Sequence, residues 1–122
     1  MKQLAIGIVC ALTCLGAHAQ TPAAPTSFEE SFMAASAEWY RGSGAAWGGE
    51  QALSVNESRA DPAACRILTE AVAREGRAAE MFAAMPARPA DSTVPQALVE
   101  KVLGELASMK RAERMRNVAC GT

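Results

Sequence analysis

The chain has 122 residues, of which 50% are hydrophobic, and its 12 basic and 13 acidic side chains give a formal net charge of −1. A charge balance this close to neutral provides no bulk attraction to nucleic acid, so we expect no nucleic-acid partner. The length fits one small domain, whose buried core leaves only a thin margin of stability.

Residues 1–19 have the pattern of a secretory signal peptide. Lys2 precedes an apolar run over residues 4–16, and Ala17-His18-Ala19 fits a cleavage site between small residues. The apolar run is about 13 residues long, shorter than the ~20 that a membrane-spanning helix needs. We therefore expect a cleaved signal peptide, no stable membrane span, and export to the periplasm or out of the cell.

Cleavage would remove the one histidine, His18, and two of the four cysteines, Cys10 and Cys14. The remaining chain would carry 11 basic and 13 acidic residues, a net charge of −2. Without an imidazole, a Ser-His-Asp triad, a Cys-His pair and a histidine-bearing zinc site are excluded. The remaining carboxylates assemble none of the usual catalytic constellations, so we expect no enzyme activity, no metal and no cofactor.

A proline-rich leader, residues 20–26, has little to bury and is expected to be flexible, ahead of a single helical domain over residues 27–122. The first helix is predicted to start at Ser27, because Ser27-x-x-Glu30 fits a capping box. Arg41-Gly42-Ser43-Gly44 is expected to end it. Its apolar residues repeat on one face: Phe28, Phe32, Ala35 and Trp39.

Residues 42–60 are the least regular part of the chain, with two pairs of glycines and Trp47 between them. No phosphate-binding glycine motif is present. We expect a flexible connector in which Trp47 folds back as a lid on the core.

A second helix is predicted from Asp61-Pro62, with Asp61 as N-cap and proline at the first helical position, to Met85. Glu75 and Gly76 interrupt its apolar stripe and are expected either to split the helix or to bend it. Residues 86–90 contain two prolines and make a connector. The stripe consists of Cys65, Leu68, Val72, Ala79 and Phe82.

A third helix is predicted from Thr93, where Thr93-x-x-Gln96 fits a capping box, to Ala119. Basic residues gather between Lys110 and Arg116, where they are expected to complement the dipole of the helix C-terminus. The apolar face consists of Leu98, Val99, Val102, Leu103, Leu106 and Met109.

The two remaining cysteines, Cys65 and Cys120, allow one disulfide in an oxidising compartment. Their midpoint falls near residue 92, close to the connector between the second and third helices. In an antiparallel hairpin, residues equidistant from the turn lie side by side, so the pair would staple its open end. We predict an all-α fold, a small bundle of three or four helices that contains this disulfide-stapled αα-hairpin.

Two function classes remain. The first is an exported helical protein that binds another exported or envelope protein, as an inhibitor, immunity-type antagonist, accessory subunit or chaperone. The second is a binder of a small ligand, lipid or cell-wall component that uses the loop around Trp47 over an apolar pocket. Candidate binding residues are the aromatic and basic side chains Tyr40, Arg41, Trp47, Lys110, Arg111 and Arg114.

Overall fold

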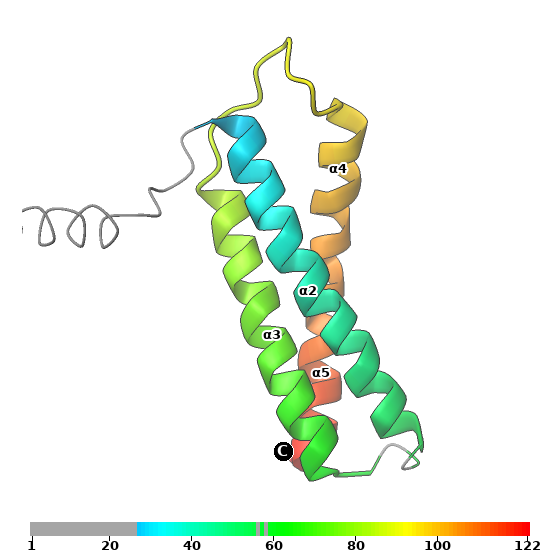
Figure 1. Ribbon diagram of the computed structural model, residues 1–122. Helices are drawn as coiled ribbons and strands as arrows, with labels where there is room; N and C mark the ends of the chain where they lie inside the picture. The colour runs from blue at the N-terminus through cyan, green and yellow to red at the C-terminus, as the bar shows by residue number, and fades with distance from the viewer. Residues whose placement is uncertain (1–26, 56, 58) are drawn as a thin grey trace, which may run out of the picture.

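The computed structural model describes residues 27–55, 57 and 59–122, which form three helical rods and no strand (Figure 1). The all-helical class predicted from the sequence is confirmed for these residues. The predicted signal peptide and the leader, residues 1–26, lie outside them. The rods are α2 (Phe28–Val55), α3 (Pro62–Ala83), and a third made of α4 (Gln96–Glu105), the 3₁₀ turn η1 (Leu106–Ser108) and α5 (Met109–Cys120).

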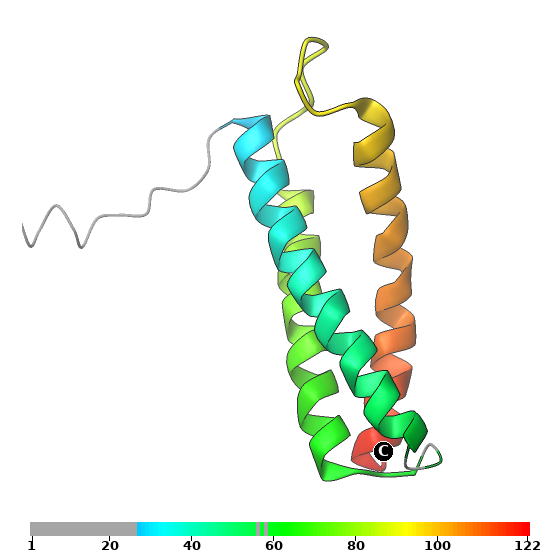
Figure 2. The same ribbon diagram turned by 45° about the vertical axis from the view of Figure 1, so that its right-hand side comes forward.

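The first and third rods run in the same direction and α3 runs opposite to both, as the two ribbon views show (Figures 1 and 2). α3 packs along both α2 and α5. We call the end of the molecule with residues 84–95 the connector end, and the opposite end, with Cys65 and Cys120, the disulfide end.

The first helix does not stop at residues 41–44 but continues to Val55. The prediction of an irregular segment over residues 42–60 is therefore wrong for residues 42–55. The reason lies in Gly42 and Gly49, which are buried against α3. A Cβ atom on Gly49 would lie 2.6 Å from Leu68 Cγ, and one on Gly42 would lie 2.9 Å from Glu75 Cγ. The close packing that glycine allows offsets the ~1 kcal/mol that each glycine costs inside a helix.

The second helix is unbroken at Gly76 and ends at Ala83, two residues before its predicted end at Met85. Its buried face differs from the predicted stripe, because Cys65, Val72 and Ala79 are only half-buried. The buried residues recur at alternating intervals of four and three: Ala64, Leu68, Ala71, Glu75, Ala78 and Phe82.

Two of the three predicted N-caps are present. The hydroxyl of Ser27 and the carboxylate of Asp61 each accept a 3.1 Å hydrogen bond from the backbone N–H three residues later. The predicted Thr93-x-x-Gln96 box does not form, and Pro95 is the N-cap of α4 without a side-chain hydrogen bond. The ring of a proline disfavours helical backbone angles in the residue before it. Val94 precedes Pro95, so it does not take the first helical position that a cap at Thr93 would require.

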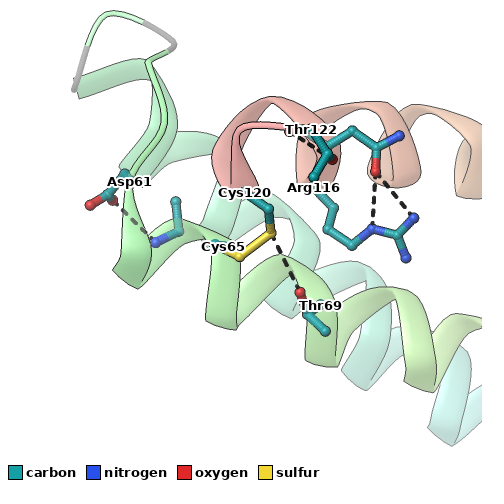
Figure 3. Close-up of a disulfide and its surroundings, with 8 residues drawn as sticks. Asp61, Cys65, Thr69, Arg116, Cys120 and Thr122 are labelled. Atoms are coloured by element: carbon teal, nitrogen blue, oxygen red, sulfur yellow. Dashed lines mark hydrogen bonds between the residues drawn. A yellow bond between two sulfur atoms is a disulfide. The ribbon is translucent and has the colours of Figure 1, made fainter.

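The predicted antiparallel pairing of the second helix with the third is present at the disulfide end (Figure 3). The Sγ atoms of Cys65 and Cys120 lie 2.02 Å apart, at disulfide distance, and their Cα atoms lie 4.8 Å apart. The backbone N–H of Asp61 also donates to the carbonyl of Ala119 at 2.8 Å. The start of α3 is therefore tied to the end of α5 by backbone as well as by sulfur.

The third rod presents a different face from the predicted one. Val99 and Val102 are buried, whereas Leu98 and Leu103 are 41% and 39% exposed. The indole N–H of Trp39 donates to a carboxylate oxygen of Glu105 at 3.2 Å, which connects α2 to the end of α4.

Candidate functional site

The buried apolar residues form two separate clusters. The connector-end core consists of Phe28, Phe32, Ala35, Trp39, Ala78, Phe82, Val94, Val99 and Val102. The disulfide-end core consists of Ala46, Leu53, Ala64, Leu68, Ala71, Ala112 and Ala119.

Between the two cores lies a level of the molecule that we call the waist. It holds Gly42 and Ser43 on α2, Glu75 on α3, and the 3₁₀ turn η1 on the third rod. Residues that pack on the cores recur every three positions from Leu106 to Met115. A 3₁₀ turn has three residues per turn, so η1 keeps Leu106 and Met109 on one face, whereas Ala112 and Met115 lie in the regular helix α5.

Glu75 is the charged residue of the waist, and only 1% of it is exposed. Neither oxygen of its carboxylate has a hydrogen-bond partner within the described part of the chain. Burial raises the pKa of Glu75 above its usual value, and the nearby carboxylates of Glu113 and Glu50 raise this pKa further. A buried carboxyl group without a partner is costly, because an isolated charge is poorly solvated in a protein interior.

A cleft of about 420 Å³ opens at the waist between α2 and α5, and Glu75 of α3 forms part of its wall. Both polar and apolar side chains line the cleft. The lining residues are Ser43, Ala46, Trp47, Glu50, Gln51, Glu75, Ser108, Arg111 and Ala112.

The other polar side chains of the cleft include a charged pair and two hydroxyls that already form hydrogen bonds. Arg111 Nε of α5 donates to Glu50 Oε1 of α2 at 2.9 Å, which bridges the two helices. The hydroxyls of Ser43 and Ser108 each donate to the backbone carbonyl three residues earlier, at 3.5 and 2.8 Å. A hydroxyl whose hydrogen is used in this way keeps its oxygen lone pairs available as acceptors.

Of the predicted binding residues, the structure brings Trp47 and Arg111 together at the cleft. Trp47 does not fold back as a lid on the core, since it lies on the continuous helix α2 and is 65% exposed. The predicted loop conformation is therefore wrong, although the residue does border a concave site.

The remaining predicted residues lie outside the cleft. Tyr40 is 50% exposed on α2, and Arg41 pairs with Glu38 at 3.7 Å. Lys110 and Arg114 are exposed one turn apart on α5. The helix ends at Cys120, one residue after its predicted end, and its last turn contains no basic residue. The basic cluster therefore lies before the last turn, and the expected role at the helix C-terminus is wrong, because the dipole effect falls off within that turn.

The acids on the surface contrast with Glu75. Glu38 has guanidinium groups from Arg74 at 3.6 Å and Arg77 at 3.0 Å in addition to Arg41. Glu29 accepts a 2.8 Å hydrogen bond from the Ser92 hydroxyl, and a backbone hydrogen bond together with this one lowers its pKa. The buried acid lacks such partners, whereas these more exposed acids have them.

Sequence reasoning treated Glu75 as an interruption of an apolar stripe and missed it as a site residue. The signal was present in the spacing, because residues 64, 68, 71, 75, 78 and 82 follow one seven-residue repeat. An acid at a core position of such a repeat is a candidate functional residue, since burial of an unpaired charge opposes folding.

Comparisons with protein-family models, with curated proteins and with solved structures find no match to this chain. Among residues 27–55, 57 and 59–122, no helix has both the length and the apolar character needed to cross a bilayer. The same residues contain no group of three or more acidic, cysteine or histidine side chains arranged to hold a metal ion.

Proposed function

We propose that this protein is exported and works by binding an α-helix of another exported or envelope protein along the outer face of α2. Such a role suits an inhibitor, an immunity-type antagonist, an accessory subunit or a chaperone. The observation that carries the proposal is a second row of uncharged residues on α2, which is exposed and lies away from the buried face of that helix.

This row, the outer seam, recurs at alternating intervals of four and three and is exposed throughout. Its large members, Met33, Tyr40 and Trp47, are 64%, 50% and 65% exposed. The whole seam consists of Met33, Ala37, Tyr40, Gly44, Trp47 and Gln51.

Large and small residues alternate along the seam from Met33 to Trp47, so a neighbouring helix would meet projections and gaps in turn, as in coiled-coil packing. None of the six carries a charge. At a rise of ~1.5 Å per residue the seam is about 27 Å long. Tyrosine, tryptophan and methionine are enriched where proteins bind one another, and a contiguous exposed apolar strip of this kind is uncommon on a monomer. A partner helix with an uncharged, apolar face fits this surface.

The proposal also covers the fold that presents the seam and the compartment in which the protein works. We propose that the three rods act as a three-helix bundle, stapled by a Cys65–Cys120 disulfide that forms after export. The signal-peptide pattern of residues 1–19 and the disulfide distance between the two sulfurs support this view. A rigid surface loses little conformational freedom on binding, which favours affinity.

The test uses a photoreactive phenylalanine analogue at Tyr40, in the protein expressed in the cells that export it. We expect a crosslink to one partner, mapped by mass spectrometry to the apolar face of a helix in that protein. The control places the same analogue at Ala73, which is exposed on α3, and should give no such product.

Three outcomes would contradict the proposal. They are equal crosslinking from both positions, absence of a crosslink from either position, and a product that joins two copies of this chain. The last would assign the seam to a homodimer instead.

The alternative function, binding of a small ligand, keeps one supporting observation. The predicted glycine-rich loop is a helix, but Trp47 borders the cleft that contains Glu75.

A further inference from the structure

We propose that the waist cleft binds an organic cation, a primary ammonium or guanidinium group carried on a short alkyl chain, with the carboxylate of Glu75 as its counter-ion. This site differs from the outer seam, although both include Trp47 and Gln51. Tyr40 belongs to the seam alone and Glu75 to the cleft alone.

The charge around the cleft is unbalanced. Among the described residues, neither oxygen of Glu75 has a hydrogen-bond partner, and the cation that lines the cleft, Arg111, is engaged by Glu50 at 2.9 Å. Glu113 of α5 adds a further negative charge near Glu75. The region is therefore short of positive charge, and a bound cation would remove the cost of burying the carboxylate.

The wall of the cleft offers hydrogen-bond acceptors. Both carboxylate oxygens of Glu75 are buried and accept no hydrogen bond from a described residue, and the hydroxyls of Ser43 and Ser108 donate elsewhere and retain lone pairs. An ammonium or guanidinium group has several donors and no acceptor, which matches a wall of acceptors.

The size and lining of the cleft also fit an organic cation. A cleft of about 420 Å³ falls within the usual range of small-molecule sites, ~300–1,000 Å³, and is far larger than a single metal ion requires. Ala46 and Ala112 supply apolar wall for an alkyl chain. The indole of Trp47 at the rim can contact the chain or face a cation.

Charged groups from the two helices that pack around Glu75 lie near it. The charged groups that face it are Glu50 from α2 and Glu113 with Arg111 from α5. Since burial and the two acids raise the pKa of Glu75, a cation should bind more tightly as pH rises and the carboxyl ionises.

The experiment titrates purified protein with n-butylammonium and n-butylguanidinium, by calorimetry and by NMR of the two indole N–H groups. We expect saturable binding of at least one cation, a shift at Trp47 larger than at Trp39, and no binding of n-butanol or butyrate. Affinity should fall at least tenfold in Glu75→Gln and less than twofold in Glu80→Gln, which removes an equal charge from an exposed site on the same helix.

A second variant covers the case in which Glu75→Gln does not fold. Ser43→Leu extends an alkyl group into the cleft from α2 and leaves Glu75 in place, and it should also weaken binding at least tenfold. Equal affinity of wild type and both variants, equal binding of n-butanol and the cations, or no binding of either cation would overturn the proposal.

A further arm distinguishes the source of the cation. Blocked lysine, with acetyl and methylamide ends, carries the same ammonium group on a peptide unit. If it binds as tightly as n-butylammonium, the cleft accepts a side chain from a protein. If only n-butylammonium binds, the cleft accepts a free amine, and either result supports an organic-cation site.

Discussion

The two ends of the molecule are packed in different ways. The connector-end core contains the aromatic rings of Phe28, Phe32, Trp39 and Phe82, with Phe32 and Phe82 in edge-to-face contact at 6.1 Å. The disulfide-end core contains five alanines and two leucines and no ring. Large side chains hold one end together, whereas small side chains let the helices approach closely at the other.

This difference changes what stabilises each end. An aromatic side chain buries ~150–250 Å², and apolar burial contributes ~25 cal/mol per Å², so each ring contributes several times what an alanine methyl group does. The disulfide end has less side-chain area to bury. Its stability depends more on close backbone packing at Gly49 and on the link between Cys65 and Cys120.

The largest predicted effect is at the connector end. Trp39 is 1% exposed and donates a hydrogen bond to Glu105, so Trp39→Ala removes a ring and leaves a cavity. We expect it to lower the free energy of unfolding by about 3–5 kcal/mol. Trp47→Ala is the matched control, because that ring is 65% exposed, and it should change stability by less than about 0.5 kcal/mol.

Urea unfolding followed by circular dichroism measures both tryptophan variants. A loss below about 1 kcal/mol for Trp39→Ala, or equal losses for the two variants, would show that the connector end does not depend on its rings.

The second prediction concerns the disulfide end. Replacing both Cys65 and Cys120 by alanine should lower the free energy of unfolding by about 2–4 kcal/mol, because the unfolded chain regains the freedom that the link removes. Reductant should reproduce this loss in the wild type and have no effect on the double variant.

Hydrogen exchange should localise the loss. Amides of α5 near the disulfide end should lose more protection than amides of α4, which packs on the connector-end core. A uniform loss along the third rod would contradict the division into two ends.

The third prediction compares neighbouring glycines. Gly48→Ala should stabilise the protein by about 0.5–1 kcal/mol, because its Cβ would meet no atom within 4 Å and alanine favours a helix. Gly49→Ala should destabilise it by about 1 kcal/mol, since its Cβ would lie 2.6 Å from Leu68 Cγ and overpacking costs ~1–3 kcal/mol. Thermal unfolding of both variants tests this, and a shift of the same sign in both would refute the close packing of α2 on α3.

The buried glycines of α2 also explain which parts of the fold could be predicted from the sequence and which could not. The caps at Ser27 and Asp61, the connector after α3 and the cysteine pairing rest on local chemistry or on spacing, and they were predictable. The course of α2 past Gly42 was not, because its glycines are explained only by the helix that packs against them.

The candidate site was harder to predict for a similar reason. Trp47 and Arg111 were singled out as separate binding residues, and nothing local brings them to one cleft. Glu75 looked like a break in a stripe, because its environment is supplied by Gly42 and by α5. A search for seven-residue repeats that admitted glycine and glutamate at core positions would have found both the long helix and the buried acid.

The last prediction concerns Glu75 at the waist, between the two ends, and gives the direction in which stability changes with pH. Burial, with Glu113 and Glu50, raises the pKa of Glu75 in the folded protein above its ordinary value of 4.5. Between the ordinary and the raised pKa, the folded state holds a proton that the unfolded state has released. The contribution of Glu75 to stability is therefore greatest below pH 4.5 and falls as pH rises through the raised pKa.

Glu75→Gln removes this dependence and keeps the shape of the side chain. Urea unfolding from pH 3.5 to 8 should show the variant gaining stability relative to wild type as pH rises. Comparing the two proteins cancels the opposite contribution of Glu29, whose lowered pKa favours the fold above its ordinary value. A difference in stability that stays constant with pH would mean that Glu75 has the same pKa in the folded protein as in the unfolded chain. Burial at the waist would then not disfavour its charged form.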